Sequence, residues 1–292
     1  MTSDNTLSDD VAQALPRRHL GRLAVNVLVA IAALQLALFL AANPRFEWSV
    51  VAEYLTAQTV LKGLGVSVVL TIFGMTLGTA LGTVLALLKL GNYRTGRAFA
   101  QTYTWLFRGT PLLIQLLFWY NLAYLLPNIS IGIPFGPQWL SWDTNELISP
   151  FTAAVLGLAL NEAAYMAEIM RAGILSVDAG QRDAARALGF TPAKSFLRII
   201  FPQAMRIVLP PAGSQVIGML KGTSLVSVIA ITDLLFSVQT IYNRNFKVVP
   251  LLIVAMVWYL TVFTVLSWLQ SRLEQRYSRG HARDATATRD GK

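Results

Sequence analysis

Apolar residues occur along this chain in long, uninterrupted blocks rather than in short helical or strand periods. A helix crosses the hydrocarbon core of a bilayer with about 20 consecutive, mostly apolar residues. Several blocks approach this length, and the block at 63–88 contains no charged residue. The pattern therefore predicts an all-α polytopic membrane protein with about six transmembrane helices, at 21–42, 63–88, 110–126, 151–172, 208–235 and 249–270.

Basic residues gather in alternate connections between these blocks, and Lys and Arg are enriched in cytoplasmic loops of membrane proteins. The opposite connections contain only four basic residues, Arg45, Lys62, Arg244 and Lys247. We therefore expect the N-terminal tail 1–20, the segment 173–202 and the C-terminal tail 271–292 to lie in the cytoplasm. The net charge of +9 is explained by this orientation, so it gives no indication of nucleic-acid binding.

The composition also limits the chemistry of the chain. It has no cysteine, which excludes disulfides and thiol catalysis, and its two histidines, His19 and His281, both lie in the tails. We therefore expect no metal site. The sequence contains no G-x-x-x-x-G-K-[ST] phosphate-binding loop, so any nucleotide chemistry must belong to a partner.

A polar stretch, GQRDAARALGFTPAKSFLRIIFP, interrupts the apolar blocks at 180–202. Gly189 directly follows the predicted end of the first helix, a position where glycine is common because it tolerates the left-handed conformation. Thr191 and Pro192 form a start signal, an N-cap hydroxyl followed by a first-turn proline. The stretch predicts a short helix, a glycine turn and a second short amphipathic helix that ends at Pro202.

Three interpretations of this stretch remain open from its pattern alone. It could be a solvated loop, a basic helix on anionic lipid headgroups, or a docking element for a cytoplasmic partner. The small side chains between charges in the first helix favour docking, because they permit close approach of another surface. A DNA-binding helix-turn-helix is disfavoured by the apolar blocks a few residues away on each side.

The same stretch resembles the cytoplasmic E-A-A loop of integral membrane subunits of prokaryotic ABC importers. The family pattern is EAA, three residues, Gly, nine residues, Ile, one residue and Leu-Pro. This chain keeps the spacing, with Asp for Glu and Phe for Leu, at Asp183, Ala184, Ala185, Gly189, Ile199, Phe201 and Pro202. The segments FRGTPLLIQLLFWY, NEAAYMAEIMRAGILSVDAGQRDAARALG and LKGTSLVSVIAITDLL resemble signatures of the polar amino acid uptake branch.

The resemblance implies a type I ABC importer transmembrane domain at 60–270, with a coupling loop at 173–202 and the helix 21–42 outside this core. It implies a pore of two permease subunits, either a homodimer or a pair with a sister chain. It further implies an external solute-binding protein, cytoplasmic ATPase subunits that hold ATP and Mg²⁺, and no cofactor in this chain. The residues assigned to ATPase coupling are Gly180, Asp183, Ala184, Ala185, Gly189, Ile199 and Pro202.

Ionisable residues within membrane spans are costly and commonly face a cavity or each other. Glu162 and Lys221 lie near the middle of the fourth and fifth predicted spans, so an ion pair between them is one hypothesis. In the other, one or both contact a polar amino acid in the translocation path. Candidate path residues are Asn161, Glu162, Lys221, Thr223 and Ser224, although the last two hydroxyls could instead bond to their own backbone.

Three further features of the spans have local interpretations. Gly74, Gly78 and Gly82 form a small-residue ridge for close helix packing. Glu168 is expected to pair with Arg171, three residues further along the same helix. Arg108 is expected to anchor the third span at the cytoplasmic headgroups, with facing the ATPase side of the pore as the alternative.

The sequence thus favours the permease subunit of an ATP-driven importer, located in the prokaryotic plasma (inner) membrane with both termini in the cytoplasm. A stand-alone secondary transporter or channel for a small polar solute is the alternative, but it does not explain the spacing around Gly189. An enzyme is disfavoured, because the spans contain no His, Cys or clustered acids.

Overall fold

The computed structural model describes residues 20–133 and 136–278, which separate into two units at Trp48. The first unit contains helix α2 (Leu20–Ala42) and a 3-10 turn (Pro44–Phe46). Phe46 stacks on Trp48 with ring centroids 5.6 Å apart, and the Trp48 indole N–H donates to the Leu40 carbonyl at 3.0 Å. α2 is apolar around its whole circumference, as a membrane-spanning helix is.

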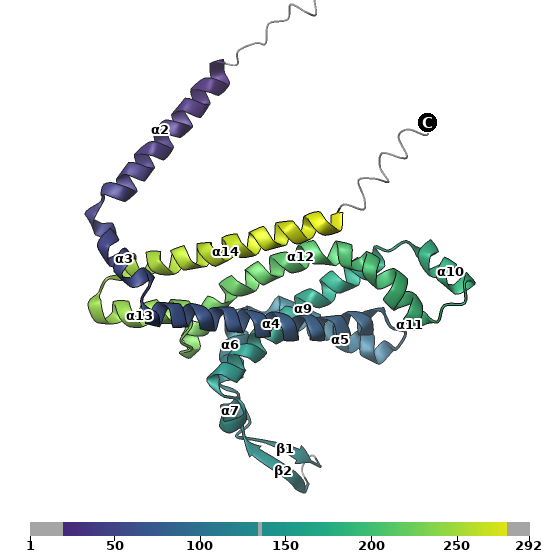
Figure 1. Ribbon diagram of the computed structural model, residues 1–292. Helices are drawn as coiled ribbons and strands as arrows, with labels where there is room; N and C mark the ends of the chain where they lie inside the picture. Colours follow the sequence, from purple (N-terminus) through teal and green to yellow (C-terminus); the bar gives the residue numbers. More distant parts are fainter. Residues whose placement is uncertain (1–19, 134–135, 279–292) are drawn as a thin grey trace, which may run out of the picture. The chain divides into compact units, whose positions relative to one another are not determined.

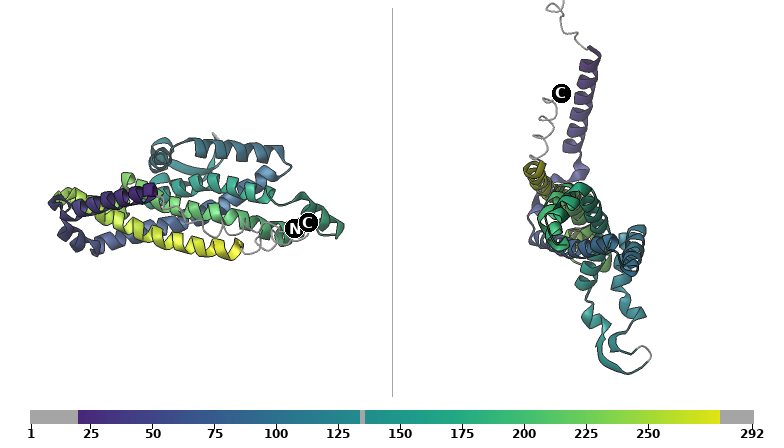
Figure 2. Two further views of the ribbon diagram at one scale, coloured as in Figure 1. Left: turned by 90° about the horizontal axis from the view of Figure 1, so that it is seen from above. Right: turned by 90° about the vertical axis from the view of Figure 1, so that its right-hand side faces the viewer.

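The second unit is a helical bundle in which α4, α9, α12 and α14 run side by side (Figure 1). Viewed end-on in Figure 2, these helices form one packed group from which a small hairpin projects. Its helices are α3 (Trp48–Leu55), α4 (Gln58–Leu90), α5 (Arg94–Gly109), α6 (Leu112–Tyr120), α7 (Leu122–Leu125), α8 (Thr144–Leu147), α9 (Pro150–Leu175), α10 (Ala179–Ala187), α11 (Pro192–Ser195), α12 (Phe201–Gly222), α13 (Leu234–Asn245) and α14 (Val248–Ser278). The end of the bundle from which α10 projects is called the α10 end below.

The parallel pair of α4 and α9 is the centre of the bundle, and it is held by glycine packing. Side chains of α9 spaced four residues apart lie directly on glycines of α4 spaced four residues apart: Leu158 on Gly74, Glu162 on Gly78 and Met166 on Gly82. Small residues allow membrane helices to approach closely, where dispersion contacts replace the missing hydrophobic driving force. The small-residue ridge predicted from the sequence is therefore a contact within this chain.

Two of the apolar clusters in the core of the second unit lie on either side of the α4–α9 pair. The larger one joins α4, α6, α9, α12 and the 3-10 segment Thr223–Ile229, and its fully buried members are Leu70, Leu116, Ala154, Leu158 and Val226. The other joins α3, α4, α13 and α14, through Val51, Val60, Leu234, Val238, Leu251, Val254 and Ala255. These clusters tie the helices on either side of the α4–α9 pair into one body.

The predicted fold class is confirmed, although two of the predicted spans are not single helices. Among the described residues, four helices are long and apolar enough to cross a bilayer, and a fifth results if a pair bent by 46° is one span. The bent pair covers the predicted span 208–235, where α12 gives way to the 3-10 segment and then to α13. The predicted span 110–126 consists of the short helices α6 and α7.

The break at the start of α6 has a local cause. Pro111 adopts an extended conformation and follows Gly109 and Thr110, so the chain leaves the helical geometry of α5 at this point. α5 itself packs against both α4 and α9, whereas its polar composition led us to expect only a connecting segment there. Beyond α7, an antiparallel hairpin of β1 (Asn128–Gly132) and β2 (Gln138–Asp143) is a small exception to the all-α prediction.

Replacing Gly82 by Ala is expected to destabilise the protein. The new Cβ would lie 2.6 Å from Met166 Cβ and 2.8 Å from the Ala163 carbonyl oxygen, so α4 and α9 would have to separate. Overpacking of this kind costs about 1–3 kcal/mol. The matched control is Gly65→Ala on the same helix, because no atom lies within 4 Å of its Cβ. Thermal unfolding in detergent measures the difference, and equal midpoints for the two variants would contradict the packing role of Gly82.

Candidate functional site

Helix α10 begins with a side-chain cap at the end of α9. Asp178 is its N-cap, and its carboxylate accepts a hydrogen bond from the backbone N–H of Gly180 at 2.7 Å. The guanidinium of Arg182 reaches back to the carbonyl of Ile174 in the last turn of α9, at 2.9 Å. α10 is therefore attached directly to the end of a membrane-spanning helix.

Gly189 ends α10 with a φ of +74°, in the left-handed region. The Gly189 N–H donates to the Arg186 carbonyl at 2.9 Å, and the Phe190 N–H donates to the Ala185 carbonyl at 3.0 Å. These two bonds form the Schellman motif that commonly closes a helix at glycine. The predicted glycine turn is therefore present at the predicted residue.

The second helix of the stretch also begins where predicted. Thr191 is its N-cap and accepts from the Lys194 N–H at 3.4 Å, with Pro192 at the first helical position. The predicted end at Pro202 is wrong, since the helix continues through a π-helical turn, Phe196–Ile200, into α12. Within this turn the Phe201 N–H bonds to the Phe196 carbonyl, and the wider turn admits Pro202 without ending the helix.

The residues assigned to coupling divide into an inner and an outer set. Ala185 is 1% exposed and Ile199 is half-buried, whereas the other members are exposed, namely Gly180, Asp183, Ala184, Gly189 and Pro202. Leu188, which was not assigned to coupling, is 75% exposed at the end of α10. The Asp183 carboxylate lies 3.7 Å from Arg186 on the same helix, but both are largely exposed, so this pair contributes little to stability.

A polar seam joins α9 to α5 and to the break between α5 and α6. Asn161, Tyr165 and Glu168 form one face of α9, as their spacing indicates, and this face meets α5. The Asn161 amide donates to the Phe107 carbonyl at 3.1 Å and to the Gln115 side-chain oxygen at 3.2 Å. The Gln115 amide also donates to the Phe107 carbonyl, at 2.9 Å, so these side chains satisfy carbonyls that the helix break leaves free.

Arg108 also lies on this seam, and its position at the headgroups stays a prediction. Its guanidinium carbon lies 5.5 Å from the ring centroid of Tyr165, which is the sixteenth residue of the 26-residue α9. At 1.5 Å per residue, Tyr165 is about 15 Å from the α10 end of its helix. Arg108 is carried to this depth because α5 forms part of the bundle. A pocket of about 370 Å³ opens beside it, lined by residues that include Lys89, Thr104, Trp105, Arg108 and Tyr165.

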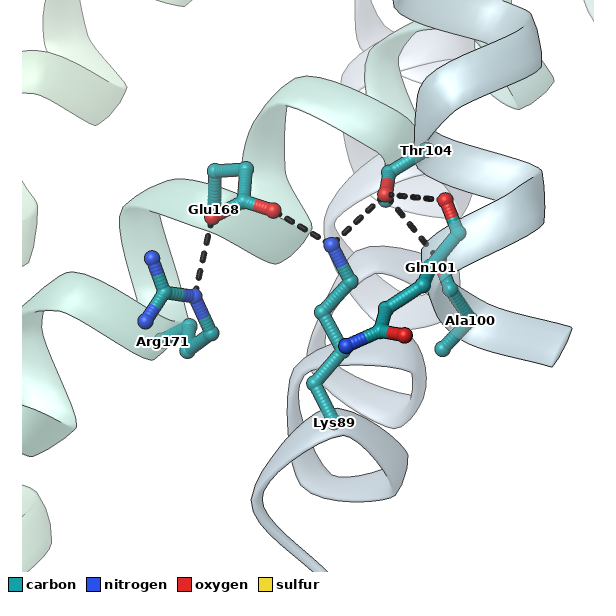
Figure 3. Close-up of polar contacts among 6 residues, drawn as sticks. All are labelled: Lys89, Ala100, Gln101, Thr104, Glu168 and Arg171. Atoms are coloured by element: carbon teal, nitrogen blue, oxygen red, sulfur yellow. Dashed lines mark hydrogen bonds and ion pairs between the residues drawn. The ribbon is translucent and has the colours of Figure 1, made fainter. Parts of the chain in front are cut away.

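An ion cluster lies one turn nearer the α10 end (Figure 3). The Lys89 ammonium of α4 donates to Glu168 of α9 and, at 2.6 Å, to the Thr104 hydroxyl of α5. The Arg171 guanidinium donates to the second Glu168 oxygen at 2.9 Å, which is the predicted i, i+3 pair. Sequence reasoning missed Lys89, because it is 79 positions away from Glu168 and a contact over such a separation has no local signal.

The predicted ion pair between Glu162 and Lys221 is wrong. Glu162 is 4% exposed, its stem lies on Gly78, and its Oε1 atom is buried without a hydrogen-bond partner. Lys221 is exposed on α12, and its ammonium lies 5.3 Å from the ring centroid of Phe263. The two residues have similar depth, but they face different neighbours, because depth along a helix does not determine the direction of a side chain.

The hydroxyls of Thr223 and Ser224 bond to their own backbone. Thr223 donates to the Leu220 carbonyl and Ser224 to the Lys221 carbonyl, both at 2.7 Å. These bonds serve the 3-10 segment that follows α12, so the backbone alternative for these two residues is the one observed.

Comparisons with known proteins agree with the arrangement of this bundle. A family model described as "Binding-protein-dependent transport system inner membrane component" matches residues 78–279. The arginine transport system permease protein ArgU of Corynebacterium glutamicum is 39% identical over 282 residues, which are 94% of this chain and 86% of that protein. The octopine transport system permease protein OccM of Rhizobium radiobacter is 35% identical over 235 residues, which are 77% of this chain and 89% of that protein.

A solved structure shares the same fold. The crystal structure of an amino acid ABC transporter with histidines superimposes with a TM-score of 0.62 and 36% identity, and the match covers 75% of this chain and 94% of that chain. The likeness therefore extends over nearly the whole of the solved chain.

The losses of stability caused by substituting Lys89 and Glu168 are expected to be strongly non-additive. Lys89→Met leaves Glu168 with Arg171 alone, and Glu168→Gln leaves the Lys89 ammonium, which is 8% exposed, without its carboxylate. Residues in one ion-pair network show interaction energies of about 0.5–3 kcal/mol, so the double variant should be more stable than the sum of the single effects indicates. Thermal unfolding of the four proteins measures this, and additive losses would argue against the cluster.

Proposed function

Since this chain belongs to the family of inner membrane components of binding-protein-dependent transport systems, it is a multi-pass permease subunit of an ABC importer, and we propose that it imports a polar amino acid. Because the chain belongs to this family, the alternative of a stand-alone transporter or channel is set aside. The subunit is not itself an enzyme. ATP and Mg²⁺ are held by partner ATPase subunits, and this chain carries no cofactor of its own.

The outward surface of α10 is the observation that carries the proposal of ATPase coupling. It combines small residues with an exposed Leu188, on a helix capped at both ends and attached to α9 through Arg182. A helix that lays an apolar side chain into a groove of a partner is a recurrent mode of protein recognition. Gly180, Asp183, Ala184 and Ala185 form the docking helix. Gly189 closes it, and Ile199 and Pro202 connect it to α12.

The remaining partners follow from this arrangement. A second permease subunit, identical or a sister chain, completes the pore, and a solute-binding protein delivers the substrate from outside. The concentration of Lys and Arg at the α10 end supports a cytoplasmic position for this end and for both termini. The membrane is then the prokaryotic plasma (inner) membrane.

The substrate proposal rests on the relatives and on one buried carboxylate. Relatives are named for arginine, octopine and L-cystine, and the solved transporter contains histidines, so each of these named molecules is a polar amino acid or a derivative of one. In this chain the Glu162 Oε1 atom is buried without a partner. A carboxylate at this depth is stabilised by a cation, so Glu162 supports recognition of a cationic group during passage. The set of path residues also includes Asn161 on α9, Lys221 on α12, and Thr223 and Ser224 on the 3-10 segment that follows α12. Asn161 and the two hydroxyls act through the backbone carbonyls to which they bond.

Gly189→Val is expected to abolish ATP-driven uptake while the protein still inserts into the membrane. A β-branched residue is strongly disfavoured at a φ of +74°, so α10 should lose its closing turn. Gly189→Asn is the matched control, because asparagine tolerates the left-handed region and should retain most of the uptake. The readouts are labelled amino acid uptake and co-purification of the ATPase. Normal uptake by Gly189→Val would remove the basis for the coupling proposal.

Glu162→Gln is expected to lower uptake of cationic amino acids at least tenfold, with Glu162→Asp intermediate. The substitution removes the charge but retains the volume that rests on Gly78. The matched control is Glu53→Gln, at an exposed position on α3. Uptake of a panel of labelled amino acids into proteoliposomes measures the effect. If Glu162→Gln transports arginine and histidine like the wild type, Glu162 does not recognise the cation.

A further inference from the structure

Two basic side chains, Lys89 and Arg108, line the pocket, and they differ in whether a carboxylate is paired with them. The Lys89 ammonium is 8% exposed and already bonded to Glu168 and Thr104. Arg108 is exposed, and within residues 20–133 and 136–278 no carboxylate lies within ion-pair distance of it. The positive charge that the pocket offers to a ligand is therefore that of Arg108.

The depth of Arg108 determines what it can face. It is level with Tyr165, about 15 Å along α9 from the α10 end, so it lies within the length of the bundle and not at its end. An unpaired guanidinium in contact with lipid tails at such a depth is costly, and ionisable groups in spans normally face a water-filled cavity or a partner group. The exposed side of Arg108 therefore belongs to an aqueous surface of the permease.

The geometry around Arg108 suits a carboxylate. A guanidinium presents a planar fork of N–H donors that binds both oxygens of a carboxylate at once. The Tyr165 ring lies against the Arg108 guanidinium and restricts its orientation, which lowers the cost of ordering it on binding. Trp105, which is 74% exposed in the same pocket, offers an apolar face to the rest of a ligand.

We propose that Arg108, held by Tyr165, is the residue of the translocation path that binds the α-carboxylate of the transported amino acid. The proposal rests on the function proposed above and adds to it a subsite of opposite charge to Glu162. The pocket of about 370 Å³ is large enough for an amino acid. Arg108 then recognises the group that all amino acids share, while Glu162 responds to the cationic group.

The test uses substrates with and without the carboxylate. Two pairs are suitable: L-arginine with agmatine, and L-histidine with histamine, because the second member of each pair is the same molecule without its carboxylate. Binding is measured on the permease, assembled with its partner subunits in nanodiscs, in the absence of the solute-binding protein. This arrangement removes the selectivity of the binding protein from the result.

The wild type is expected to bind the amino acid at least tenfold more tightly than the amine. Arg108→Gln should weaken amino acid binding at least tenfold and amine binding less than twofold, so the preference disappears. Arg108→Lys should retain part of the preference, which excludes a simple folding defect. Arg94→Gln, at an exposed position at the start of the same helix, is the matched control and should behave like the wild type.

Each contrary outcome identifies what fails. A wild-type preference that persists in Arg108→Gln overturns the carboxylate site alone. A wild type that binds none of these amino acids, and takes up no member of a wider panel, overturns the proposed function together with it. A defect of Arg108→Gln that appears only in nanodiscs with anionic lipid assigns Arg108 to lipid phosphate and also overturns the proposal.

Discussion

The contact between the glycines of α4 and one face of α9 is the constraint on which the other polar contacts of the bundle depend. Leu158, Glu162 and Met166 rest on three glycines at the same spacing, and Cβ atoms added to the second and third of them, Gly78 and Gly82, would collide with α9. This fit fixes the rotation of α9 about its axis. The adjacent face, with Asn161 and Tyr165, is consequently directed toward α5, where its polar groups meet the broken helix and Arg108.

Polar side chains along α9 consequently perform two different tasks. Asn161 and Glu168 bond to neighbouring helices, Asn161 at the α5–α6 break and Glu168 to Lys89 of α4, and Glu168 also pairs with Arg171 of α9 itself. These groups position α5 against α9, and buried polar groups with partners rigidify a core. Glu162 and Arg108 differ, because each has a charged atom without an oppositely charged partner among the described residues.

The path from α10 to the spans is short and continuous. α9 ends at Leu175, three residues before the Asp178 cap of α10, and Arg182 bonds back to its last turn. On the other side, α11 passes through a π-helical turn into α12 without a break. A displacement of α10 by a docked ATPase would thus act on α9 and α12 together. Both helices carry residues assigned to the proposed path, which gives the coupling a physical route.

The sequence by itself determined the features that depend on residues close together along the chain. These include the apolar spans, the glycine turn at Gly189, the cap at Thr191 and the pair of Glu168 with Arg171, because hydrogen bonds and contacts three or four residues apart are set locally. Only the tertiary structure decided the partners of residues far apart. Residue spacing indicates depth in a bilayer but not the direction in which a helix faces, so Lys89 met Glu168, whereas Glu162 and Lys221 remained apart.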